Sequence, residues 1–161
     1  MKTLLLLRHG KSKRGPEYAT DLERPLAGRG KRDSQRVGEL LAEEDLVPDQ
    51  IISSPAERAR QTALRCAVAA DYQGTIRFER TLYMSGDNAY LELLWALGDS
   101  IGSVLCVGHN PDIESVIESF CRQYVRMPTA ALARIDFDIE SWKEVYEGGG
   151  RLIWVRLPRE R

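Results

Sequence analysis

The chain has 161 residues, the size of one domain, and we expect residues 1–161 to form a single domain. Hydrophobic residues make up 43% and charged residues 29%, close to globular averages, which excludes wholesale disorder. The longest apolar runs have five residues, far short of the ~20 that a membrane-spanning helix needs, so a transmembrane protein is excluded. The apolar run at residues 4–7 is also too short for a signal peptide, and we therefore expect a cytoplasmic protein.

The net charge of −1 conceals an uneven distribution along the chain. Residues 1–36 carry ten Lys or Arg and four Asp or Glu, a net of +6, whereas residues 37–161 carry thirteen and twenty, a net of −7. This asymmetry indicates an anionic ligand near the N-terminal segment, although Lys13, Arg14, Lys31 and Arg32 could equally serve only to solvate a loop and a helix face. The three cysteines are odd in number and unrelated in spacing, which favours reduced thiols over a disulfide framework.

The apolar pattern predicts alternating strands and helices. The continuous run at residues 4–7 predicts a strand buried on both faces, and the periodicity of residues 27–44 predicts an amphipathic helix. Repeated strand and helix units predict an α/β fold with a mainly parallel central sheet and helices on both faces. Next along the chain we predict a strand at residues 50–53, a helix at 55–70, a strand at 75–78, a helix at 89–97, a strand at 103–107, a helix at 111–123 and strands at 132–137 and 152–155.

Chemically capable residues follow three of the predicted strands. Residues 8–10 read Arg-His-Gly, residues 53–62 contain Arg58, and residues 108–111 read Gly-His-Asn-Pro. Ligands of such folds bind beyond the carboxyl ends of the strands, and both histidines of the chain, His9 and His109, lie at these ends. We therefore expect the functional site there.

Two helix starts are predicted to face this site. Ser54 is expected to cap one helix, with Pro55 in its first position and Glu57 completing a capping box. Asn110 and Pro111 are expected to repeat the arrangement at a second helix. Helix N-termini favour anions, phosphate above all, and this supports a phosphate site.

Three residues suit the same ligand. Arg8 and Arg58 offer guanidinium groups fitted to bidentate phosphate contacts. Gly10 lacks a side chain, so its backbone could approach a ligand closely. Cys106 and His109 have a spacing that suggests a metal pair, but zinc takes three or four ligands. The sequence has no second cluster of cysteine and histidine, so no zinc site is predicted.

Residues 7–10, 54–62 and 107–111 together resemble the histidine phosphatase superfamily, which has the phosphoglycerate-mutase-like fold. Within this superfamily, further residues of the chain resemble those of the small SixA-type phosphohistidine phosphatases. These matches are Asp21, Arg24, Pro25, Leu26, Gly30, Thr129 and Trp142.

The resemblance implies a three-layer sandwich and a covalent mechanism. His9 would attack phosphorus and form a phosphohistidine that water then cleaves, with a backbone carbonyl fixing its tautomer. Arg8, Arg58 and His109 would hold the phosphoryl oxygens. The resemblance implies no metal and no organic cofactor. The substrate-binding residues expected beside these are Gly10, Ser12, Asp21, Arg24 and Asn110, although Asp21 and Arg24 could instead close a loop over the site.

The sequence also departs from many family members. Lys11 and Gly15 stand where others carry Glu or Gln and Asn, and the catalytic Glu after the third strand is not recognisable, which leaves Glu79 and Asp87 as substitutes. A phosphate ester needs a general acid more than a phosphorylated imidazole does, because the P–N bond is labile.

We therefore expect a phosphatase acting on phosphohistidine of a phosphotransfer protein. The alternatives are a phosphatase of small phosphate monoesters and a non-catalytic phosphate-binding or phosphoprotein-binding module. The expected partner is a phosphorylated protein or a small phosphorylated molecule, with no nucleic acid and no membrane. A monomer is expected.

Overall fold

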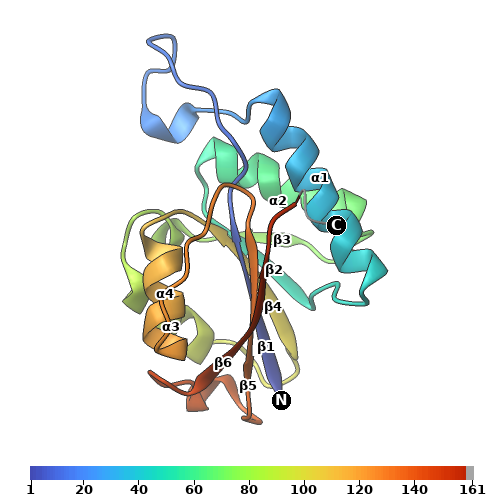
Figure 1. Cartoon of the computed structure of the whole chain (residues 1–161), viewed down its shortest axis with the longest axis vertical. Coiled ribbons are helices and arrows are strands. Elements are labelled where there is room, and N and C mark those ends of the chain that lie inside the picture. Colours follow the sequence, from blue (N-terminus) through green and yellow to red (C-terminus); the bar gives the residue numbers. More distant parts are fainter. Residues whose placement is uncertain (159–161) are drawn as a thin grey trace.

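A computed structural model describes residues 1–158 and shows a mixed six-stranded sheet (Figure 1). The strands lie in the order β3-β2-β4-β1-β5-β6. The pairs among β3, β2, β4 and β1 are parallel, whereas β5 pairs antiparallel with β1 and β6 pairs antiparallel with β5. The mainly parallel sheet is thus confirmed, with an antiparallel side built by the last two strands. The strands are β1 (Lys2–Arg8), β2 (Gln50–Ser53), β3 (Ile76–Phe78), β4 (Ser103–Gly108), β5 (Leu132–Phe137) and β6 (Gly150–Arg156).

Helices cover both faces of the sheet, as predicted. Figure 1 shows α1 and α2 on one side and α3 and α4 on the other. Within residues 1–158, no helix combines the length and the apolar character that crossing a membrane would take. The helices are α1 (Gly28–Glu43), α2 (Glu57–Ala69), α3 (Asp87–Trp95) and α4 (Asp112–Cys121), with short 3-10 turns η1 (Asp21–Glu23), η2 (Arg80–Leu82) and η3 (Trp142–Glu144).

The β1 strand lies inside the sheet and separates two hydrophobic cores. Leu4 and Leu6 pack in the core that contains residues of α3 and α4, whereas Leu5 and Leu7 pack in the core that contains residues of α1 and α2. All four leucines are fully buried. The uninterrupted apolar run follows from this position, because alternate side chains of a central strand enter opposite layers.

The predicted starts of two helices are wrong. The α2 helix begins at Glu57 after an Ala56 N-cap that makes no side-chain capping bond, so the capping box predicted from Ser54 does not form. The α4 helix begins at Asp112, its N-cap is Pro111, and this cap makes no side-chain bond either. In both places the predicted cap residue is engaged elsewhere in the functional site.

The α1 and α2 helices approach each other closely at Gly38. A Cβ atom at this position would collide with the backbone oxygen of Cys66 and would lie 2.6 Å from the Cβ of Ala69. The absence of a side chain therefore brings the two helices together on one face of the sheet. Both helices start at the carboxyl edge of the parallel strands, the edge at which His9 lies.

Candidate active site

His9 directly follows β1 and is held by backbone contacts. Its backbone nitrogen donates to the oxygen of Gly108, 3.1 Å away, and its ring Nδ1 lies 2.7 Å from the oxygen of Gly10. A carbonyl oxygen only accepts, so Nδ1 of the neutral ring carries the proton and Nε2 keeps its lone pair. The expected contact to a backbone carbonyl is present, and it leaves the lone pair of Nε2 free.

Gly10 fixes the backbone beneath this histidine. Its nitrogen donates to Oγ1 of Thr62 on α2 over 3.1 Å. A Cβ atom at Gly10 would lie 2.7 Å from the backbone oxygen of Gly30 in the first turn of α1. Residue 10 is therefore clamped between the starts of two helices, and a side chain there would push α1 away.

His109 follows β4 and faces His9, with 5.1 Å between the ring centroids. Its Nε2 lies 2.8 Å from Oγ of Ser54, and the same oxygen accepts a bond from the nitrogen of Ala56 over 3.2 Å. A hydroxyl both donates and accepts, so Ser54 can donate to Nε2, and in that tautomer Nδ1 of His109 carries the ring proton. Nδ1 is buried and has no hydrogen-bond partner within residues 1–158.

Arg8 and Arg58 supply the positive charge of the site. One nitrogen of Arg8 donates to the backbone oxygen of Met127 over 3.1 Å, while its buried Nε has no partner in the described part of the chain. Arg58 is only 3% exposed, and both of its Nη atoms donate to Asp21, at 2.7 and 2.8 Å. Two buried or half-buried guanidinium groups thus flank the two histidines.

Asp21 connects the loop after Gly10 to α2. Besides Arg58, its carboxylate accepts from the hydroxyl of Tyr83 at 2.7 Å and from Arg24 at 2.7 Å. The Tyr83 hydrogen bond, followed by those of the two arginines, holds the pKa of the Asp21 carboxyl far below its ordinary value. Arg24 also donates to Oγ of Ser12 over 2.6 Å, so this network closes the loop over one side of the site.

Burial keeps both histidines uncharged. Desolvation, with smaller effects of Arg58 and Arg8, outweighs the hydrogen bond to Gly10 and lowers the pKa of His9 to about 4. Desolvation, followed by His9 and Arg58, lowers the pKa of His109 to about 3. At neutral pH the site therefore combines two neutral imidazoles with cationic guanidinium groups.

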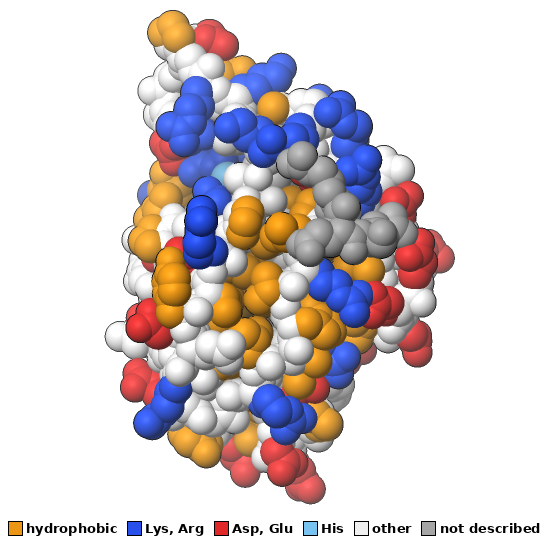
Figure 2. Space-filling model, in the orientation of Figure 1, with side chains coloured by type: hydrophobic (Ala, Val, Ile, Leu, Met, Phe, Trp, Pro, Cys, Tyr) orange, Lys and Arg blue, Asp and Glu red, His pale blue; other side chains and the backbone are white. Residues whose placement is uncertain are grey.

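These side chains surround a cavity of about 360 Å³. Asp21 is the only carboxylate among the residues that line it within 1–158, and in Figure 2 lysine and arginine side chains gather around a histidine at the upper end of the molecule. The cavity is therefore suited to an anion. The lining residues are Arg8, His9, Lys11, Ser12, Arg14, Asp21, Arg24, Arg58, Met84, His109, Asn110 and Thr129.

The structure brings together all predicted site residues, with Gly10 contributing its backbone. Asn110, predicted as a helix cap, instead donates from Nδ2 to the oxygen of Met127 over 2.9 Å, beside Arg8. Glu79 and Asp87 do not line the cavity. Glu79 pairs with Arg77 at 2.6 Å, and Asp87 is the first residue of α3, so neither is placed among the residues that line the cavity as a general acid would be.

Sequence reasoning missed two contributors. Ser54 was assigned to a helix cap rather than to His109, and nothing singled out Tyr83, whose ring stands edge-on to His109 with 5.3 Å between the centroids. Tyr83 reaches the site from the segment after β3, 62 residues from the carboxylate it contacts, so no local pattern marks it.

Comparison with known proteins agrees with this geometry. The family model described as "Histidine phosphatase superfamily (branch 1)" matches residues 4–82. The fold is similar to that of the protein histidine phosphatase SixA complexed with tungstate, with a TM-score of 0.85, 23% identity and 97% of each chain covered. It is similar to an Agrobacterium tumefaciens protein assigned as the phosphohistidine phosphatase SixA, with a TM-score of 0.82, 29% identity and 98% of each chain covered. An uncharacterized protein of Mycobacterium tuberculosis is 29% identical over 164 residues, 95% of this chain and 100% of its own length.

The chain belongs to the histidine phosphatase superfamily and is a phosphatase of the class that uses a histidine nucleophile. Within this superfamily it is SixA-like, since the similarity to the SixA structures extends over nearly the whole chain.

Proposed function

We propose that the protein hydrolyses phosphohistidine on a phosphotransfer protein, with His9 as the nucleophile. One observation carries the choice of substrate: Asp21 is the only carboxylate that lines the described site, and three hydrogen-bond donors hold it ionised. An ionised carboxylate cannot donate a proton to a leaving group, so the site suits a substrate that leaves without a general acid.

The first step transfers the phosphoryl group to the enzyme. The lone pair on Nε2 of His9 attacks phosphorus, the new P–N bond forms, and the P–N bond of the substrate breaks with its electron pair going to the departing imidazole nitrogen. When the second nitrogen of that ring carries a proton, the imidazole leaves as a neutral molecule. An alkoxide from a phosphate ester would instead need a proton delivered as it leaves.

Three groups stabilise the phosphoryl oxygens during transfer. The unpartnered Nε of Arg8 and the proton on Nδ1 of His109 both lie buried and free to donate. Arg58 adds a positive charge that is already fixed by Asp21. Donors that are oriented before the reaction stabilise developing charge without the cost of reorganisation.

The second step regenerates the enzyme. Water attacks phosphorus on Nε2 of His9, the P–N bond breaks, and inorganic phosphate leaves while the lone pair returns to His9. The contact between Nδ1 and Gly10 holds the same tautomer throughout, so the ring returns ready for the next attack. Both protons of the water leave with the inorganic phosphate, so the second step balances without a further proton acceptor.

The comparisons support this choice of substrate. Two of the similar structures are named as a protein histidine phosphatase and a phosphohistidine phosphatase. The three cysteines are free thiols, in keeping with a reducing compartment, and we place the reaction in the cytoplasm.

Mass spectrometry of the intact protein tests the mechanism. After brief exposure to a histidine-phosphorylated protein at neutral pH, the wild type is expected to gain one phosphoryl group transiently, and His9→Gln is expected to gain none. His109→Gln keeps the nucleophile and loses one of the three donors, so it is expected to gain the phosphoryl group more slowly than the wild type. A phosphoryl group appearing on His9→Gln would refute the assignment of His9.

A comparison of substrates tests the leaving group. We expect phosphohistidine protein to be hydrolysed at least about a hundredfold more efficiently than an alkyl phosphate such as phosphoserine, whose alkoxide leaving group needs a general acid. Efficient ester turnover would refute the phosphohistidine assignment in favour of a small-molecule phosphatase. Tight binding of phosphate without any turnover would indicate a binding module.

A further inference from the structure

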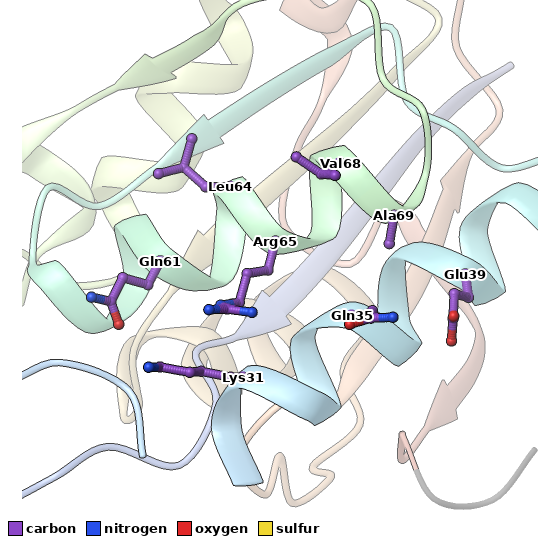
Figure 3. Close-up of a pocket in the computed structure, with 8 residues that line it drawn as sticks. All are labelled: Lys31, Gln35, Glu39, Gln61, Leu64, Arg65, Val68 and Ala69. Carbon is purple, nitrogen blue, oxygen red and sulfur yellow. The ribbon is translucent and has the colours of Figure 1, made fainter. Parts of the chain in front are cut away.

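A second cavity, of about 610 Å³, lies on the outer surface between α1 and α2 (Figure 3). Both helices run in the same direction along this groove, with their starts at the end of the molecule that holds the active site. The groove is not part of the reaction described above. Its lining residues are Lys31, Gln35, Glu39, Gln61, Leu64, Arg65, Val68 and Ala69.

The groove is basic at the end near the active site. Figure 3 shows the end groups of Lys31, Arg65 and Gln61 pointing into the same space between the helices. Neither Lys31 nor Arg65 forms an ion pair with any residue in 1–158. This end belongs to the region of positive charge evident in residues 1–36, only part of which the phosphate site uses.

Apolar side chains accompany this charge on α2. Val68 is 82% exposed, and Leu64, one helical turn before it, is 37% exposed. Residues four apart lie on the same face of a helix, so the two form an exposed apolar strip beside the charged end. A basic site next to an apolar strip is what an amphipathic acidic segment would complement.

The groove lies next to the active site and shares packed segments with it. Gln61 accepts a hydrogen bond from the nitrogen of Leu26 over 2.8 Å, and Leu26 pairs with Ser12, which lines the catalytic cavity. Arg58 lies one turn before Gln61 on the same helix. A partner lying in the groove would therefore be held beside the segments that carry the catalytic cavity.

We propose that the groove between α1 and α2 docks an acidic α-helix of the histidine-phosphorylated substrate protein. The inference rests on the proposed function and adds the feature of the substrate that is recognised. Carboxylates on the helix face Lys31 and Arg65, and an apolar side chain packs on Leu64 and Val68. Two neighbouring helices present a groove whose spacing accepts the ridge of a third, which favours a helix as the occupant.

Steady-state kinetics with two substrates tests the proposal. The first is phosphoimidazole, which reaches only the catalytic cavity, and the second is a four-helix histidine-phosphotransfer domain with an acidic surface, phosphorylated with phosphoramidate. The variants are Arg65→Glu and Val68→Asp, both of exposed residues on α2. The matched control is Lys143→Glu, an exposed charge reversal at η3, outside both cavities.

We expect both groove variants to raise KM for the phosphorylated domain about tenfold or more, with kcat and the rate on phosphoimidazole unchanged. Lys143→Glu should leave the kinetic constants for both substrates unchanged. Added salt should raise KM for the phosphorylated domain more in the wild type than in Arg65→Glu. Unchanged KM in the groove variants of an active enzyme would overturn the docking proposal and leave the function intact.

Other outcomes separate the remaining alternatives. A wild type that hydrolyses neither substrate would refute the proposed function itself. Equal losses on both substrates in Arg65→Glu would overturn docking, because the residue would then act on the catalytic cavity. A dimer in sedimentation that Val68→Asp converts to a monomer, with KM unchanged, would overturn it too and identify a second copy of the chain as the occupant.

Discussion

Acidification from pH 7 to pH 5 should leave His9 in its reactive, neutral form. The pKa of His9 is lowered to about 4, chiefly because the ring is buried with 7% exposure, and secondarily by Arg58 and Arg8. At pH 5 about 90% of His9 then remains neutral, whereas about 3% would be neutral at an ordinary pKa near 6.5. The nucleophile should therefore stay available well below the usual titration range of histidine.

The same shift makes the fold less stable in acid. Between pH 6.5 and 4 the unfolded chain binds a proton at His9 that the native state does not, so the free energy of unfolding falls as pH falls through this window. The full loss from His9 is about 3 kcal/mol, and it vanishes about one pH unit above 6.5. His109, with a pKa of about 3, adds a loss of the same sign that extends further into acid.

Two measurements check these values. NMR titration of the imidazole ring resonances reports each pKa directly, because the chain has only two histidines. His109→Asn leaves a single ring to observe and should keep His9 titrating near pH 4, since His109 is not among the groups that shift it. Urea unfolding between pH 7 and 4.5 should show the loss of stability, and His9→Asn should reduce it. A His9 ring that titrates near 6.5 would refute the reasoning.

Three further outcomes are expected. Ser54→Ala should slow phosphoenzyme formation about tenfold, equivalent to ~1.4 kcal/mol, because His109 loses the partner of its Nε2. Stopped-flow rates test the slowing, and the ring ¹⁵N chemical shifts of His109 test the change of tautomer. Asp21→Asn should bind inorganic phosphate severalfold more tightly in calorimetry, because a negative charge leaves the anion site, and weaker binding would show that the carboxylate acts by orienting its arginine. Gly38→Ala should lower the free energy of unfolding by about 1–3 kcal/mol, whereas Gly98→Ala, where a Cβ meets nothing within 4 Å, should change urea unfolding little.

Some residues of the phosphatase site are neighbours in the sequence, whereas others that contact each other are far apart in the chain. Arg8, His9 and Gly10 are consecutive, and their place at the end of a buried strand can be predicted from the leucines before them. The bond from Arg58 to Asp21 spans 37 residues, and no local pattern announces it. The loop that carries Asp21 was therefore predicted only as a neighbour of the site, with its part in the network open.

The wrong helix caps have the same origin. A hydroxyl or amide that could cap a helix takes whichever partner the folded chain offers at the better geometry. Ser54 reaches His109, 55 residues away, and Asn110 reaches the carbonyl of Met127. A capping pattern in the sequence considers only the nearby backbone groups that a side chain could bind. In an active site, distant groups also compete for the hydrogen bonds of that side chain.

The sequence by itself determined the order and type of the strands and helices, since apolar periodicity reports which side chains must leave water. It also determined that both histidines stand where strands end. Only the tertiary structure decided which nitrogen of each ring is held by the protein, that Arg58 and Arg24 pair with Asp21, and that Glu79 and Asp87 are not among the residues that line the cavity. These properties depend on the direction of single hydrogen bonds between segments far apart in the chain, and only the packing of the whole sheet and its helices sets those directions.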